Sequence, residues 1–80
     1  MTIDLLLFAS ASDALGARSV RLELPEKATV ADLRRALASL PGADRIPARS
    51  MVARNRVYAR DADPVAPGDE LALIPPVSGG

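Results

Sequence analysis

Cysteine and histidine are both absent from this chain of 80 residues. Without cysteine the protein has no disulfide, no thiolate metal ligand and no nucleophilic thiol. Without histidine it lacks the usual general base near neutral pH. Catalytic triads, zinc sites and Cys-His chemistry are therefore excluded, and any reactive group of the chain must be of another kind.

Aromatic residues and net charge are also scarce. Phe8 and Tyr58 are the only aromatic side chains, so the core must be built from Leu, Val and Ile. The formal net charge is zero, and we therefore expect neither nucleic acid nor an anionic membrane as a partner. The first residues carry no basic segment, and their apolar run is far too short to span a bilayer. We expect a cytoplasmic protein.

The first quarter of the chain predicts two strands. Eighty residues leave room for one sheet and about one helix around a small core. The apolar run at residues 3–9 is typical of a central strand, with Leu6 and Phe8 on the face opposite Leu5. Residues 10–17 are polar, and the clean alternation of residues 18–24 then predicts a half-exposed second strand.

One amphipathic helix of about three turns is predicted next. Thr29 is the expected N-cap, and Asp32 stands at the third helical position as the acid of a short capping box. Pro41-Gly42 ends the helix. Four apolar residues recur at helical spacing between these signals: Val30, Leu33, Leu37 and Leu40.

The second half of the chain predicts more strands. Residues 43–50 resemble a loop, residues 51–60 form two short strands around a turn at Asn55-Arg56, and residues 70–74 form the last strand. The order strand, strand, helix, short strands, strand predicts an α+β fold of the β-grasp type, a mixed sheet around one main helix. We assign residues 1–74 to this domain and residues 75–80 to an extended C-terminal tail.

The tail reads PPVSGG and carries the most specific similarity to known proteins. Together with LLLFA, Leu15-Gly16, ATVADLRRAL, Asn55 and APGDELALIPPV, it resembles the MoaD family, the small sulfur-carrying subunit of molybdopterin synthase. The resemblance covers the chain from end to end. It implies the ubiquitin-like β-grasp fold; the PPVSGG close is the specific part of the resemblance, whereas the remainder is shared more loosely by many β-grasp proteins.

The resemblance implies chemistry at the C-terminus. In the family, a partner that resembles the ubiquitin-activating enzymes, of the MoeB type, adenylates the terminal carboxylate with ATP. Sulfur from a donor protein then displaces AMP and leaves a thiocarboxylate, here on Gly80. The thiocarboxylate gives its sulfur to a pterin precursor in a large subunit of the MoaE type, within a heterotetramer, to form the molybdopterin dithiolene. The chain itself is expected to bind no cofactor and to have no activity alone.

The tail residues suit entry into a partner. Gly79 and Gly80 lack side chains, so the chain can pass through a narrow channel. The two prolines end strand pairing and favour an extended backbone, and six residues reach roughly 20 Å at about 3.3 Å each. The residues expected to thread into the partner are Pro75, Pro76, Val77, Ser78 and Gly79.

Several interpretations remain open from the sequence. The same Gly-Gly chemistry serves sulfur carriers for thiamin thiazole or another product, and a ubiquitin-like modifier or a plain interaction module also fits. Leu6 and Phe8 are either covered by the domain's own loops or form a docking surface. A loose basic stretch is either solvated surface or a contact with an acidic partner. Its members are Arg45, Arg49, Arg54, Arg56 and Arg60.

Overall fold

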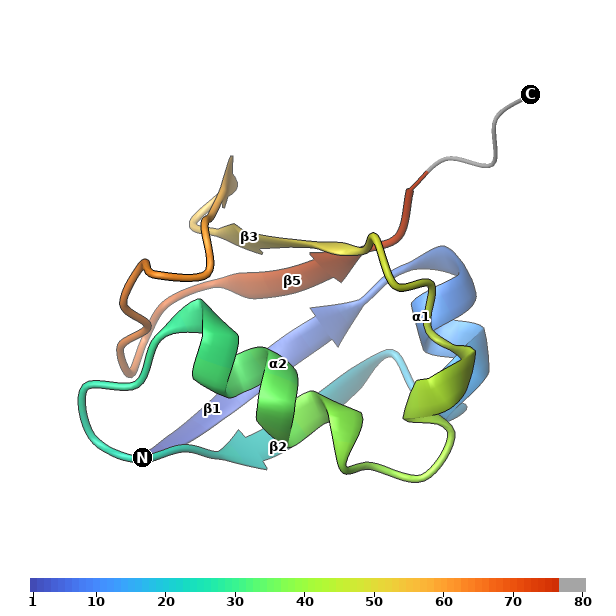
Figure 1. The fold of residues 1–80 in the computed structure, drawn as a ribbon, viewed down its shortest axis with the longest axis horizontal. Coiled ribbons are helices and arrows are strands. Elements are labelled where there is room, and N and C mark those ends of the chain that lie inside the picture. The colour runs from blue at the N-terminus through green and yellow to red at the C-terminus, as the bar shows by residue number, and fades with distance from the viewer. Residues whose placement is uncertain (77–80) are drawn as a thin grey trace.

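A five-stranded mixed sheet in the order β2-β1-β5-β3-β4 forms the centre of the computed structural model, which describes residues 1–76 (Figure 1). β1 and β5 run parallel at its centre, with Leu5 opposite Leu71 and Leu7 opposite Leu73. The other neighbouring pairs are antiparallel. The strands are β1 (Thr2–Leu7), β2 (Ser19–Glu23), β3 (Met51–Arg54), β4 (Val57–Tyr58) and β5 (Leu71–Ile74).

Alternation along the strands decides which face of the sheet forms the core. Along β1 buried and exposed residues alternate strictly, so that Leu5 is buried while Asp4 and Leu6 are exposed. In β5 Leu71 and Leu73 point to the same side and are almost completely buried. The predicted first and last strands are therefore confirmed, and the first lies in the centre of the sheet as expected.

Helix α2 (Val30–Ala38) covers the buried face of the sheet. Its capping box is present: the amide of Thr29 donates to Asp32 Oδ2 at 2.9 Å, and the amide of Asp32 donates to Thr29 Oγ1 at 3.4 Å. The helix buries Val30, Leu33 and Leu37 against the sheet, which matches the predicted apolar spacing. It ends at Ala38, however, so that the fourth predicted residue, Leu40, lies beyond it and is only partly buried.

The loop before β5 accepts hydrogen bonds from the N-terminal end of α2. The amide of Val30 donates to the carbonyl of Asp63 at 2.9 Å, and the amide of Ala31 donates to the carbonyl of Asp61 at 3.0 Å. These bonds satisfy two amides that a helix start leaves without intrahelical partners. On the helix surface Arg34 Nε pairs with Asp61 Oδ1 at 3.0 Å. The segment 61–63 is thus attached to the helix by backbone and side chain.

A second helix, α1 (Ala9–Leu15), occupies the segment that the sequence analysis treated only as a polar stretch. That interpretation was wrong. β1 ends at Leu7, Phe8 takes the N-cap position without a side-chain capping bond, and the first turn of α1 has no acidic residue. The helix is held by tertiary packing, because Ala11 is completely buried in the core.

Gly42 lets the segment after α2 approach α1 closely. It precedes a short 3₁₀ helix, Ala43–Arg45, within the region predicted as a loop. A Cβ on Gly42 would lie 2.5 Å from the carbonyl oxygen of Ala14, and its φ of +88° is left-handed. Only glycine fits this position without displacement of the backbone.

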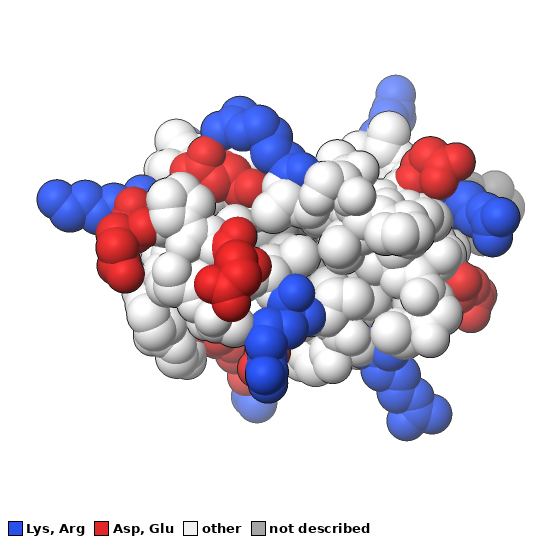
Figure 2. All heavy atoms as spheres, turned by 90° about the horizontal axis from the view of Figure 1, so that it is seen from below, with Lys and Arg blue, Asp and Glu red and all other residues white. Residues whose placement is uncertain are grey.

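Charged side chains are scattered over the surface. Figure 2 shows acidic and basic side chains interspersed, some at the margin of the view and others near its centre, with neither sign gathered into one field, and a broad uncharged area on the right of the view. Within residues 1–76 no group of acidic side chains could hold a metal ion. No helix in the described part of the chain is long and apolar enough to cross a membrane.

Candidate functional site

The sheet face opposite α2 exposes apolar side chains. Leu6 and Phe8 lie there with 41% and 49% of their surface exposed, so the domain's own loops do not cover them. Tyr58 lies on the same face, because it pairs with Ala53, which in turn pairs with the outward-facing Ala72. We refer to this surface as the open face.

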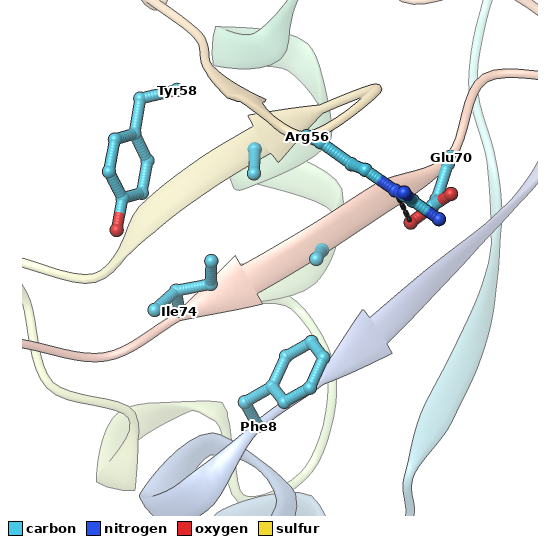
Figure 3. A pocket seen from close by; sticks show the side chains of 7 residues that line it. Phe8, Arg56, Tyr58, Glu70 and Ile74 are labelled. Carbon is cyan, nitrogen blue, oxygen red and sulfur yellow. Dashed lines mark ion pairs between the residues drawn. The ribbon is translucent and has the colours of Figure 1, made fainter.

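A groove runs along the open face over β5. Its volume is about 360 Å³. Figure 3 shows the rings of Phe8 and Tyr58 on opposite sides of β5, with Ile74 near one end of the groove and the Arg56–Glu70 pair near the other. We call it the open-face groove; the residues that line it are Phe8, Ala53, Arg56, Tyr58, Glu70, Ala72 and Ile74.

Two alanines make the floor of the open-face groove. Ala53 and Ala72 are direct cross-strand partners on β3 and β5, and each has only a methyl group. Larger side chains flank them on both sides: Tyr58 on β4 is the direct partner of Ala53, and Phe8 follows the end of β1, beyond the pair of Leu7 with Leu73. The small residues at the centre and the rings on the two sides therefore create the hollow. A leucine at position 53 or 72 would fill it.

The β3–β4 hairpin sets the position of Tyr58. Asn55 and Arg56 both have positive φ, 54° and 71°, which is the backbone of a two-residue type I′ turn. Asn55 also fixes the hairpin to the start of β5, since its Oδ1 accepts the amide of Glu70 at 2.9 Å. Arg56 Nε lies 3.6 Å from Glu70 Oε1 at the end of the groove.

Asp69 completes the attachment of the hairpin. Its carboxylate accepts the Nδ2 of Asn55 at 3.1 Å and the amide of Ala66 at 2.8 Å, and Arg54 lies 3.6 Å away. The hydrogen bond from Asn55, followed by the one from Ala66, lowers the pKa of Asp69 below its ordinary value. The ionised form of Asp69 is thus the one that the folded protein stabilises.

The open-face groove adjoins the base of the predicted tail. Ile74 is the last residue of β5 and lines the groove, and Pro75 follows it directly, half-buried, before the exposed Pro76. The groove and the start of the tail are therefore parts of one continuous segment. The predicted tail residues Val77, Ser78, Gly79 and Gly80 lie outside the described residues.

Sequence analysis named part of the open face only. It singled out Leu6 and Phe8; Phe8 lines the open-face groove, whereas Leu6 lies in a neighbouring hollow with Phe8 and Arg18. It missed Tyr58 and Ile74. The predicted hairpin at Asn55-Arg56 held the signal for Tyr58, because a two-residue turn places that side chain on the same face as Ala53.

The basic stretch is partly neutralised. Arg54 and Arg56 pair with Asp69 and Glu70, both at 3.6 Å. The remaining three arginines are exposed and form no ion pair within residues 1–76: Arg45, Arg49 and Arg60. The stretch is therefore not one continuous cationic surface, and its role as a partner contact stays a prediction.

A mixed sheet around one main helix, with an apolar open face beside the end of its last strand, defines a ubiquitin-like β-grasp protein. The chain belongs to the ThiS family, whose sequence model matches residues 5–80. The resemblance to sulfur carriers and the predicted α+β β-grasp fold are both confirmed.

Two relatives are similar over nearly the whole chain. The molybdopterin synthase sulfur carrier subunit of Chlamydomonas reinhardtii is 35% identical, and the match covers 100% of both chains. Small archaeal modifier protein 1 of Haloferax volcanii is 40% identical over 92% of this chain and 95% of its own.

Solved structures agree on the fold. A crystal structure of the Haloferax volcanii modifier has a TM-score of 0.85 at 36% identity and covers 100% of both chains. A complex of subunits 1 and 2 of the molybdopterin-converting factor from Helicobacter pylori contains a chain with a TM-score of 0.71 at 21% identity, again over 100% of both. At that identity the second likeness concerns the fold alone.

Proposed function

We propose that this chain is the sulfur carrier subunit of a molybdopterin synthase. The observation that carries the proposal is the match to the Chlamydomonas reinhardtii subunit of that name, which extends over 100% of both chains. The open-face groove supports it, since a carrier must dock on other proteins and this groove lies beside the base of its tail.

The chemistry takes place at the carboxylate of Gly80. An ATP-dependent adenylyltransferase, of the kind that resembles the ubiquitin-activating enzymes, joins the carboxylate to AMP. Sulfide-level sulfur released by a donor protein then attacks the carbonyl carbon, the C–O bond to AMP breaks, AMP leaves with the electron pair, and a thiocarboxylate results. The thiocarboxylate transfers its sulfur to the pterin precursor held by the large subunit. This chain contributes only its acyl group, which fits a sequence without cysteine or histidine.

The open-face groove is the docking site for the large subunit. Its two aromatic rings, Phe8 and Tyr58, offer the kind of amphipathic anchors that dominate protein interfaces. A partner bound over Ile74 would also fix where the tail begins, and six residues from Pro75 onward reach roughly 20 Å into its active site. We expect two carriers on a large-subunit dimer, and we place the reaction in the cytoplasm.

Mass spectrometry of the intact protein tests the proposal. The chain is incubated with an adenylyltransferase, ATP and a sulfur source, beside a variant that lacks Gly80. We expect a mass increase that corresponds to one oxygen replaced by sulfur in the full chain and none in the variant. The loaded chain should then convert the pterin precursor when the large subunit is added. An unloaded full chain, with an enzyme active on another carrier, would contradict the proposal.

Conjugation to other proteins is a second candidate function. The 40% identity to small archaeal modifier protein 1, and the TM-score of 0.85 with its crystal structure, favour it. Protein adducts linked through Gly80 in cell extracts would support this function. Co-purification with a thiazole-forming enzyme, in place of a synthase large subunit, would instead indicate a carrier for thiamin thiazole.

A further inference from the structure

Lys27 is the only lysine in the chain. Of the ten basic residues nine are arginines, whose guanidinium groups stay protonated and do not act as nucleophiles under ordinary conditions. The scarcity of lysine matters for a protein whose C-terminus is activated, because the amine of a lysine can attack an acyl-adenylate. Among all side chains of this protein, Lys27 alone carries such an amine.

The other primary amine is engaged within the fold. The Met1 amino group donates a hydrogen bond to the carbonyl of Leu24 at 2.5 Å in a part-buried position. The amide of Leu24 in turn donates to the carbonyl of Met1 at 2.8 Å, which fixes the start of β1 to the end of β2. An attack by the Met1 amine would require its hydrogen bond to the carbonyl of Leu24 to break.

Lys27, by contrast, is presented to solvent by a fixed turn. It is exposed between Glu26 and the buried Ala28, and its φ of 61° is left-handed. The carbonyl of Ala28 accepts the amide of Val65 at 3.0 Å, and Thr29 caps α2 immediately afterwards. Within residues 1–76 no ion pair holds the Lys27 amine. The backbone is anchored while the side chain extends outward.

The position of Lys27 favours attack on another copy of the chain. The turn between β2 and α2 lies at the opposite end of the molecule from the point where β5 ends and Pro75 follows (Figure 1). The turn that carries Lys27 therefore lies far from the point where β5 ends. We expect the acyl group that reaches Lys27 to come from a second molecule.

We propose that Lys27 is a modification site that accepts the activated C-terminus of a second copy of this chain, so that the protein can join to itself through an isopeptide bond. The inference rests on the proposed activation of Gly80. The Nζ of Lys27 attacks the carbonyl carbon of the Gly80 acyl-adenylate, a C–N bond forms and the C–O bond to AMP breaks. AMP leaves with the electron pair, and the amine loses its proton to solvent.

Two variants separate donor from acceptor. Lys27→Arg keeps the charge and the Gly80 terminus but has no acceptor amine, so it can only donate. The chain without Gly80 keeps Lys27 but cannot be activated, so it can only accept. Mixed with an adenylyltransferase and ATP in the absence of sulfur, the two should form one product, whose mass is the sum of both chains less one water. Peptide mapping should place the junction at Lys27.

Controls distinguish the failure of this inference from failure of the proposed function. Hydroxylamine, added in a parallel reaction, captures any acyl-adenylate as the Gly80 hydroxamate. Loss of all conjugate when the acceptor also carries Lys27→Arg would support the assignment. Conjugate that persists in that acceptor, or a hydroxamate without any conjugate, would overturn it. Absence of the hydroxamate as well would overturn activation itself and this inference with it.

Discussion

Asn55 and Asp69 join the β3–β4 hairpin to the turn before β5, with Asn55 Nδ2 donating to Asp69 Oδ1 at 3.1 Å. Asn55 also accepts the amide of Glu70 through Oδ1 at 2.9 Å. The amide of Asn55 itself donates to the carbonyl of Glu70 at 2.7 Å. One residue in a left-handed conformation thus attaches the hairpin, and with it Tyr58, to the central strand of the sheet.

Replacement of Asn55 should destabilise the hairpin attachment. Asn55→Ala loses both side-chain hydrogen bonds and places a less suitable residue at a φ of 54°, so the free energy of unfolding should fall by about 2 kcal/mol. Asn55→Gly loses the same hydrogen bonds but places glycine, which tolerates a left-handed backbone, at this position. Its free energy of unfolding should therefore fall by only about 1 kcal/mol. Denaturant titration measures both. Equal losses would show that the backbone conformation contributes nothing.

Two glycines separate the effect of a close approach between backbone segments from the effect of a left-handed φ. Gly42 and Gly68 have nearly the same φ, +88° and +90°, but only a Cβ on Gly42 meets another atom, the carbonyl oxygen of Ala14 at 2.5 Å. Gly68→Ala should cost about 1 kcal/mol of unfolding free energy for the backbone alone. Gly42→Ala should cost about 3 kcal/mol, because backbone must also move. Similar losses in thermal unfolding would rule out a close approach.

Asp32 should make stability depend on acid pH. The hydrogen bond from the Thr29 backbone, and next the one from Arg35, lower its pKa below the ordinary value of 3.8. A lowered pKa in the folded state stabilises the protein above 3.8, and this contribution is lost as pH falls through the folded value. Thermal unfolding of Asp32→Asn should therefore depend less on pH in that range. Parallel curves for the two proteins would contradict this.

Tyr58 should contribute to binding of the large subunit without contributing to folding. Its neighbour Val57 is equally exposed, 68% against 62%, but points to the other side of the hairpin and does not line the open-face groove. Tyr58→Ala should weaken the complex about tenfold, whereas Val57→Ala should not. Calorimetric titration gives both affinities, and both variants should unfold like the parent. Equal affinities would place the interface elsewhere.

A larger side chain at position 79 should impair adenylation and sulfur transfer but not folding. Gly79→Val adds a β-branched side chain that hinders passage through a narrow channel, so adenylation and sulfur transfer should slow by about tenfold or more. Gly79 belongs to the segment 75–80 that the sequence predicts as a tail, so the unfolding free energy should change by less than about 0.5 kcal/mol. Single-turnover transfer kinetics measure the effect. Unchanged rates would mean that a slender tail is not required.

Local sequence signals predicted those helices and strands whose ends and faces are set by residues close in the chain. Thr29 and Asp32 predicted the start of α2, and the alternation of residues 18–24 predicted the half-exposed strand β2. Helix α1 lacks a start signal of this kind, because Phe8 provides no cap and the helix depends on the burial of Ala11; its one local signal is at its end, where Gly16 takes the left-handed C-cap position. The sequence showed that Leu6 and Phe8 are apolar. It did not show whether they are exposed, because that depends on whether another segment of the chain covers them.

The sequence by itself determined a small aliphatic α+β domain, the capped helix α2, the turn at Asn55-Arg56 and a chemistry that leaves no reactive cysteine or histidine. These properties depend on composition and on neighbours a few residues apart. Only the tertiary structure decided the open-face groove, because the register of β3 against β5 brings Ala53 beside Ala72. That pairing joins segments far apart in the chain, and no local pattern specifies it.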